Sequence, residues 1–142
     1  MTAASLLLPV LPVAVDLPWG LIVAIKGLAL GHQAKGRHIV VSAIEHSSVL
    51  NSVKALERLG FTATLVPVDG SGRVDPAGVE QALTKETTLV SVMTANSEVG
   101  TIEPIAAIAA AAKPRGVLVH TDAAAAAGSV PLDIQALGVD AL

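Results

Sequence analysis

The sequence predicts an α/β protein whose core is a mainly parallel sheet flanked by helices. Short β-branched runs alternate with segments of helical periodicity after residue 36, and such alternation is typical of crossover connections between parallel strands. The apolar residues are mostly Ala, Val, Leu and Ile, which suits a sheet buried on both faces. The 142 residues allow one modest domain with a core of its own.

Composition excludes several functional classes. Lys and Arg together number 9 against 12 Asp and Glu, so the net charge is −3, and a nucleic-acid partner is not expected. The chain has no cysteine, which excludes a disulfide scaffold, a thiolate zinc site and a thiol nucleophile within these residues. Trp19 and Phe61 are the only Trp, Tyr or Phe residues, so base stacking is poorly supported.

The N-terminal region divides into an irregular apolar segment over 1–20 and an amphipathic helix over about 21–33. The run 3–25 is just long enough for a membrane span. Three prolines and Asp16 interrupt it, and each disfavours a helix in hydrocarbon. A secretory signal needs a basic start, yet the first lysine is Lys26. We therefore expect no membrane segment, no export signal and a cytoplasmic location.

The strands are expected where short apolar, β-branched runs occur. The second run is followed by a Gly-rich turn over 69–73 (DGSGR). The last five residues, GVDAL, have the pattern of a further strand's start. The four expected strands are 38–42 (HIVVS), 62–68 (TATLVPV), 87–93 (TTLVSVM) and 116–122 (GVLVHTD).

Three helices are expected between these strands. The first, over 47–60, places Val49, Val53, Leu56 and Leu59 on one face and ends at Gly60, a residue suited to the C′ position. The second begins with Asp75 as N-cap and Pro76 as first residue, and continues to residue 83. The third is Ala-rich and extends from Glu103-Pro104 to near Lys113-Pro114. Neither an internal repeat nor a linker is apparent.

Polar residues follow three of the expected strands. They are Glu45-His46, Asn96-Ser97-Glu98 and His120-Thr121-Asp122. Ligands of open α/β sheets bind beyond the carboxyl ends of the strands. We therefore expect these groups to lie along one edge of the sheet.

Each group also has a purely structural interpretation. Asp122 is either an N-cap for the Ala-rich segment after it or a buried carboxylate that pairs with a cationic ligand. His46 is either a surface histidine beside the next helix or a functional one. Asn96-Ser97-Glu98 is most simply a polar loop. A zinc site from His46, His120 and Asp122 has no recognised spacing, so no metal is expected.

Two further motifs are absent. Neither Ser47 nor Ser97 lies in a Gly-x-Ser-x-Gly elbow, which argues against a serine nucleophile. The DGSG turn lacks the Lys-Ser/Thr ending of a phosphate-binding loop.

Four blocks of the chain, read in order, carry a family resemblance: GRHIVVSAIEHSSVLNSV, PVDGSGRVDP, LVSVMTANSEVGTIEPI and GVLVHTDAAAAAGSVPLDIQALGVDAL. They resemble the cysteine desulfurases and related selenocysteine lyases, which belong to the class V aminotransferase group of pyridoxal-phosphate (PLP) enzymes. The resemblance extends from about Ile22 to Leu142. It implies that 21–142 is a partial large, PLP-binding domain of fold type I.

The resemblance gives roles to the same residues at the strand ends. His46 matches the histidine that stacks on the cofactor ring and assists proton transfer. Asp122 matches the aspartate that pairs with the protonated pyridine nitrogen, which lets the ring act as an electron sink. Asn96 and Ser97 match the Asn-Asn pair of a loop whose second Asn bonds the ring hydroxyl. The expected cofactor site is therefore His46, Asn96, Ser97 and Asp122, with His46 also catalytic and pyridoxal 5′-phosphate as cofactor.

Several positions depart from the family pattern. Ser97 replaces the second Asn, and Ala125 stands where the family usually has a Gln that reaches the ring oxygen. Residues 17–21 read LPWGL in place of the Gly-Gly-Thr-Glu turn that binds the cofactor phosphate. The cofactor-linking lysine and the nucleophilic cysteine belong to blocks that come later in the family. None of the lysines present has a matching context: Lys26, Lys35, Lys54, Lys85 and Lys113.

The resemblance therefore implies a fragment of a cysteine desulfurase-like enzyme that cannot complete the reaction alone. The family reaction removes sulfur from L-cysteine and yields alanine and an enzyme persulfide, as in iron–sulfur cluster biogenesis. The substrate is a small amino acid, cysteine or selenocysteine, and the full-length family forms homodimers. Two alternatives stay open: a non-catalytic truncated remnant, or a fragment of another class V enzyme such as selenocysteine lyase. The in-frame sequence downstream would discriminate between them.

Overall fold

The computed structural model describes residues 17–142 and is built around a four-stranded sheet. Its strands are β1 (His38–Ser42), β2 (Thr62–Val66), β3 (Thr87–Ser91) and β4 (Leu118–His120). They lie in the order β2-β1-β3-β4, and every neighbouring pair is parallel. The predicted α/β fold with a parallel sheet is confirmed. Most of the expected irregular segment, residues 1–16, lies outside the described residues.

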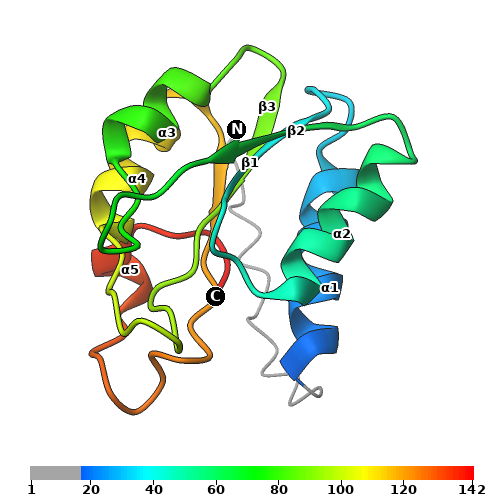
Figure 1. Ribbon diagram of the computed structural model, residues 1–142. Helices are drawn as coiled ribbons and strands as arrows, with labels where there is room; N and C mark the ends of the chain where they lie inside the picture. The colour runs from blue at the N-terminus through cyan, green and yellow to red at the C-terminus, as the bar shows by residue number, and fades with distance from the viewer. Residues whose placement is uncertain (1–16) are drawn as a thin grey trace, which may run out of the picture.

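Helices cover both faces of the sheet (Figure 1). One face carries α1 (Leu17–Gly31) and α2 (Ser47–Glu57); the other carries α3 (Pro76–Ala82), α4 (Ile105–Ala112) and α5 (Ile134–Leu137). Successive side chains of β1 point to opposite faces of the sheet. Ile39 and Val41 pack in the core cluster with α1 and α2, whereas Val40 packs in the cluster with α3 and α4. Because both faces are covered, β1 is buried along its whole length.

Helix α1 begins at Leu17, earlier than the expected start near Leu21, and it ends at Gly31. Pro18 therefore lies in the first turn of the helix. A proline is tolerated there because its missing N–H has no partner in the helix in any case. The expectation of an irregular chain up to residue 20 is thus wrong for residues 17–20. Among residues 17–142, no helix combines the length and apolarity that crossing a bilayer requires.

The end of α2 confirms the predicted role of Gly60. Its N–H donates to the carbonyl of Glu57 at 3.0 Å, and the next N–H, of Phe61, donates to Leu56 at 3.1 Å. This is the Schellman pattern, and it requires the positive φ of +89° that Gly60 adopts. Leu59 does not share the buried face as expected. It is 58% exposed because the helix ends at Glu57, before that position.

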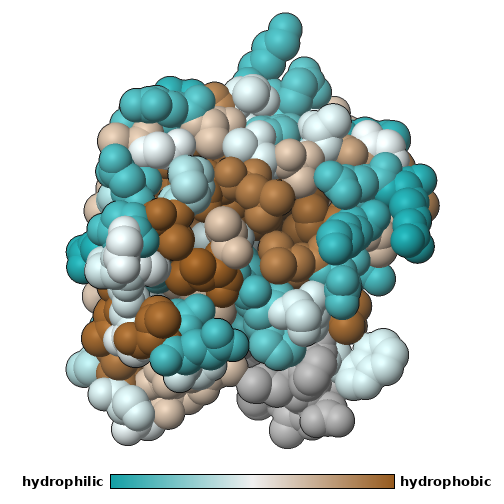
Figure 2. Space-filling view, viewed as in Figure 1, coloured by the Kyte–Doolittle hydropathy of each residue, from teal (hydrophilic) through white to brown (hydrophobic). Residues whose placement is uncertain are grey.

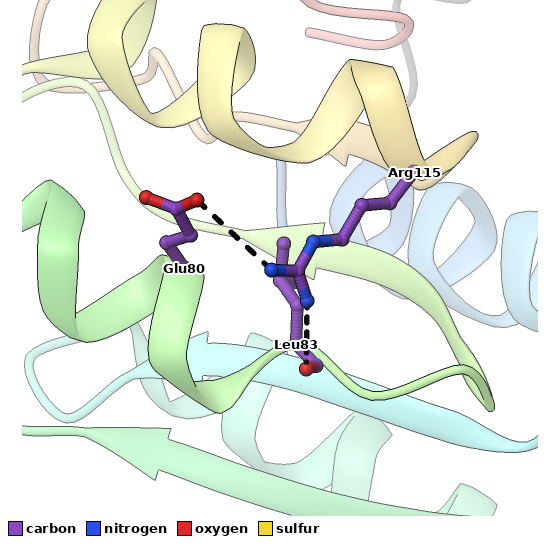
Figure 3. A network of polar contacts seen from close by, with 3 residues as sticks. All are labelled: Glu80, Leu83 and Arg115. Atoms are coloured by element: carbon purple, nitrogen blue, oxygen red, sulfur yellow. Dashed lines mark hydrogen bonds and ion pairs between the residues drawn. The ribbon is translucent and has the colours of Figure 1, made fainter.

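Helices α3 and α4 begin close to their predicted starts. The Asp75 carboxylate accepts the N–H of Ala77 at 2.9 Å, with Pro76 as the first helical residue. Helix α4 begins at Ile105 and leads into a short 3-10 turn, Lys113–Arg115. The Arg115 guanidinium then donates to the Leu83 carbonyl at 3.1 Å and lies 4.0 Å from Glu80 (Figure 3). This exposed ion pair contributes little to stability.

Three strands are shorter at their carboxyl ends than predicted, and one helix was not predicted. Strands β2, β3 and β4 end at Val66, Ser91 and His120, because the residues after them leave the sheet to form loops. Helix α5 carries signals that the sequence analysis missed: Asp133 caps its start, and Gly138 closes it with a φ of +71°. The expected further strand is reduced to one parallel bridge between Ala141 and His120.

Candidate functional site

The chain segments that follow the strands meet at the carboxyl edge of the sheet. One oxygen of the Glu45 carboxyl group, after β1, accepts the N–H of Met93, after β3, at 2.7 Å. The N–H of Thr94 then donates to the carbonyl of Asp122, after β4, at 2.8 Å. These two bonds join the three polar groups side by side. The predicted placement along one edge of the sheet is confirmed.

A pocket of about 460 Å³ opens at this edge. Its lining includes Glu45, His46 and Ser47 from one loop and Asn96 and Ser97 from another. Asp122 does not line this pocket. Its carbonyl accepts the N–H of Thr94, the residue that follows the lining residue Met93. The pocket therefore brings together three of the four expected cofactor-binding residues, with the fourth behind them.

His46 caps the N-terminus of α2. Its Nδ1 accepts the N–H of Ser48 at 3.2 Å and lies 2.6 Å from the Ser48 hydroxyl oxygen. Because Nδ1 accepts a hydrogen bond, the neutral ring carries its proton on Nε2. The residue is exposed. The structure thus has the surface histidine beside a helix that the structural interpretation describes, and His46 lines the pocket.

Both polar atoms of the Asn96 side-chain amide form hydrogen bonds within the protein. Its Oδ1 accepts the N–H groups of Glu98 at 2.8 Å and Val99 at 3.1 Å, and its Nδ2 donates to the Ile44 carbonyl at 3.4 Å. These bonds fold residues 96–99 into a turn and fasten it to the loop that follows β1. Ser97 is exposed at the tip of this turn. The predicted polar loop is therefore present, and Asn96 shapes it.

Asp122 is a buried carboxylate, only 5% exposed. Its Oδ1 accepts the N–H of Ala124 at 2.9 Å, which is a capping bond. The residues that follow, 124–129, form successive turns and not the helix that the capping interpretation requires. Within residues 17–142, Arg115 with Glu80 is the single ion pair, so Asp122 has no cationic partner there. A buried carboxylate without such a partner is costly and favours a cationic ligand.

His120 lies deeper in the sheet, only 1% exposed, with Nδ1 2.9 Å from the Ser91 hydroxyl oxygen. Burial lowers the pKa of His120 to about 4, and the charge of Asp122 opposes this shift only in part. The ring is therefore neutral near pH 7 and serves the core. In residues 17–142, no group of three His, Cys, Asp or Glu side chains is arranged to hold a metal ion.

The sequence motifs predict no role for Glu45, yet it is the acid with the largest pKa shift in the site. The Ser42 hydroxyl donates to its Oε1 at 2.5 Å, and the Met93 N–H donates to the same oxygen. Burial raises the pKa of Glu45 to about 8, which the hydrogen bonds from Ser42 and Met93 only partly oppose. The signal available in the sequence was a carboxylate directly before a histidine at a strand end.

A parallel α/β sheet with polar loops and a pocket at its carboxyl edge defines a ligand-binding α/β domain. The family model Aminotransferase class-V matches residues 20–142. The chain belongs to the class V aminotransferase family, as the four sequence blocks predict.

The curated relatives are cysteine desulfurases. The chain is 47% identical over 119 residues to "Cysteine desulfurase IscS" of Dictyoglomus turgidum, a match that covers 84% of this chain and 30% of that protein. The protein of the same name from Anaeromyxobacter sp. is 48% identical over 117 residues, covering 82% of this chain and 29% of that protein. The chain thus spans about 30% of the length of the relatives it matches.

Solved structures show the same arrangement. "SspA in complex with cysteine" superposes with a TM-score of 0.82 at 33% identity, over 87% of this chain and 35% of that one. A "NIFS-LIKE PROTEIN" gives 0.82 at 35% identity, over the same shares. A C-DES mutant with glycine covalently linked to the PLP cofactor gives 0.76 at 28% identity, over 88% of this chain and 34% of that one. The chain therefore corresponds to one part of a cysteine desulfurase-like protein.

Proposed function

We propose that residues 21–142 form the part of a desulfurase large domain that binds the ring of pyridoxal 5′-phosphate. The observation that carries the proposal is Asp122, a buried carboxylate at the carboxyl edge of the sheet with no cationic partner in residues 17–142. A protonated pyridine nitrogen is the cation such a carboxylate requires. Family membership supports this choice of ligand, since one structural neighbour is described with a PLP cofactor.

The residues present offer the chemical groups that the ring half of the cofactor needs. Asp122 would hold the proton on the ring nitrogen, His46 would lie against the ring face, and Ser97 would reach the ring hydroxyl. The bound cofactor would supply an electron sink for the substrate's reacting bonds. Of these residues, His46 and Ser97 line the pocket, while Asp122 is fixed behind it by the bonds to Thr94 and Ala124.

The phosphate half has no such fit in this region. Residues 17–21 lack the Gly-Gly-Thr-Glu turn and form the first turns of α1 instead. Ser97 has a shorter side chain than the Asn it replaces, and Ala125 has no polar group to offer the ring oxygen. The proposal for these residues is therefore limited to recognition of the ring.

The proposed substrate of a complete desulfurase that contains this domain is L-cysteine. The proposed reaction yields alanine and a persulfide on a cysteine that is not among these residues. A structural neighbour described in complex with cysteine supports this substrate. Three functions are proposed for the residues of this chain: His46 moves a proton at the ring face, Asp122 holds the ring proton, and Asn96 shapes the pocket wall. Homodimer formation and a cytoplasmic location stay predictions.

Pyridoxine 5′-phosphate tests the ring site, because it lacks the aldehyde and cannot react with lysines. We expect weak, millimolar-range binding by ligand-observed NMR, since two ring contacts contribute only about 2–4 kcal/mol. The Asp122→Asn variant keeps the bond to Ala124 but loses the charge, and should bind at least about tenfold more weakly. Glu57→Gln, on exposed α2 surface, is the matched control. Equal binding by Asp122→Asn and the parent chain would contradict the proposal.

A further inference from the structure

We infer that Glu45 is a positioning residue, a hydrogen-bonded tie between the ends of β1 and β3 that sets the pocket wall carrying His46 and Asn96. The tie consists of two hydrogen bonds that are accepted by the same carboxyl oxygen of Glu45. The Ser42 hydroxyl at the end of β1 donates to Oε1, and the Met93 N–H beyond β3 donates to the same atom at 2.7 Å. The importance of this tie for the reaction rests on the proposed function; the tie itself does not.

Besides the bond between Glu45 and Met93, the loops that follow β1 and β3 are joined, within the described residues, by only one weak hydrogen bond of Asn96. Asn96 donates to the Ile44 carbonyl at 3.4 Å, which is long for an amide hydrogen bond. The bond between Glu45 and Met93 is shorter and lies directly between the adjacent strands. His46 follows Glu45 in the chain and begins α2. The position of the His46 ring therefore depends on where Glu45 is held.

Burial favours the neutral form of Glu45, and the two hydrogen bonds of the tie oppose this only in part. Its carboxyl group is 6% exposed, and its Oε2 is buried without a hydrogen-bond partner. The acids Asp122 and Glu103 both raise its pKa further. A charged Glu45 would add a third negative group to this edge. Burial among acids therefore holds the pKa of Glu45 well above its ordinary value.

The pH dependence of the tie follows from this burial. The pKa of Glu45 is about 8 in the fold against 4.5 in a solvated chain. The folded arrangement therefore retains a proton that an opened loop releases between these values. Opening becomes easier as pH rises from 4.5 to about 8 and levels off above that. A permanently neutral side chain at this position removes the dependence.

Hydrogen–deuterium exchange of the full chain, read by mass spectrometry, tests the inference without any cofactor. Rates in the segments 43–48 and 92–97 are compared at about pH 5.5 and 7.5 after division by intrinsic amide rates. In the parent chain we expect opening to increase at least about tenfold between the two values. In Glu45→Gln, opening should be as infrequent at both pH values as in the parent chain at about pH 5.5, because the amide oxygen can still accept the two hydrogen bonds. In Glu45→Ala, opening should be frequent at both pH values.

Glu57→Gln is the control, because Glu57 is an exposed glutamate of α2 that does not contribute to the shifted pKa of Glu45. It should retain the pH response of segment 92–97. Opening that does not change with pH in the parent chain, or equal opening in Glu45→Gln and Glu45→Ala, would overturn the inference. If the tie is found but Asp122→Asn binds pyridoxine 5′-phosphate normally, only the proposed function fails.

Discussion

Three of the four proposed site residues also satisfy the local backbone. His46 caps a helix, Asn96 holds a turn, and Asp122 accepts an N–H two residues ahead. The structural interpretations of the sequence describe a surface histidine, a polar loop and a helix cap at Asp122. The first two are present, but residues 124–129 form turns and not the expected helix. What the sequence did predict is their shared position at strand ends. What it could not predict is burial, which distinguishes Asp122 from the exposed His46.

The two duties of His46 can be separated by substitution. His46→Ala removes the acceptor for the Ser48 N–H. We expect the free energy of unfolding to fall by about 1 kcal/mol. His46→Asn supplies another good cap acceptor and should restore stability, although it has no ring to lie against the cofactor. Urea denaturation at low protein concentration measures both variants.

Asn51→Ala, at an exposed position of the same helix, provides the control, because Ala is the better helix former and no loss is expected. If His46→Asn is as unstable as His46→Ala, then His46 does not stabilise α2 through its capping bond.

At the scale of elements, hydrophobic pattern and caps predicted every strand and all but one helix. The exceptions have physical reasons. Helix α5 is a single turn, Ile134–Leu137, and is too short for a periodic pattern. Strand β3 ends early because the Met93 N–H bonds to the Glu45 side chain instead of to the backbone of β1. A sequence pattern records apolar runs but not these cross-loop partners.

The strand β2 is the element most prone to association. In residues 17–142 it pairs with β1 alone, and its Leu65 is 58% exposed. Apolar side chains also gather in the middle of one face, between the two helical layers (Figure 2). Unpaired strand edges and exposed apolar patches favour self-association. We therefore expect the chain to oligomerise in sedimentation experiments.

Leu65→Lys should move the concentration at which oligomers form upward by about tenfold, because an edge lysine opposes strand addition. Leu59→Lys is the matched control, since Leu59 is equally exposed but lies in a turn. A sharp monomeric peak with cooperative unfolding for the parent chain, or equal effects of the two variants, would show that β2 is not the associating edge.

At the scale of the whole molecule, the chain holds contacts for one half of a cofactor. Asp122, His46 and Ser97 are suited to the ring, while residues 17–21 have no phosphate turn. The chain also spans about 30% of its desulfurase relatives. Its fold is that of the family, yet the family reaction needs more groups than these residues supply.

We therefore predict that this chain forms no stoichiometric covalent adduct with pyridoxal phosphate and releases no alanine from cysteine. Charge-assisted pairing at Asp122 contributes about 1.5–3 kcal/mol, and stacking on His46 about 0.5–1.5 kcal/mol. Micromolar binding requires about 8 kcal/mol, and no lysine lines the pocket that contains His46. The cofactor should therefore react only weakly and at scattered lysines.

Borohydride reduction of the mixture, followed by mass spectrometric mapping, measures this directly. The labelling pattern should match that of the same chain in urea, where every lysine is exposed and no site exists. The folded chain should differ only in lower labelling of partly covered positions such as Lys26. Full labelling of one lysine in the folded chain, together with alanine release from cysteine, would mean that these 142 residues contain a complete cofactor site. The ring contacts of Asp122 and His46 would then be supplemented by a phosphate contact that the family pattern does not predict.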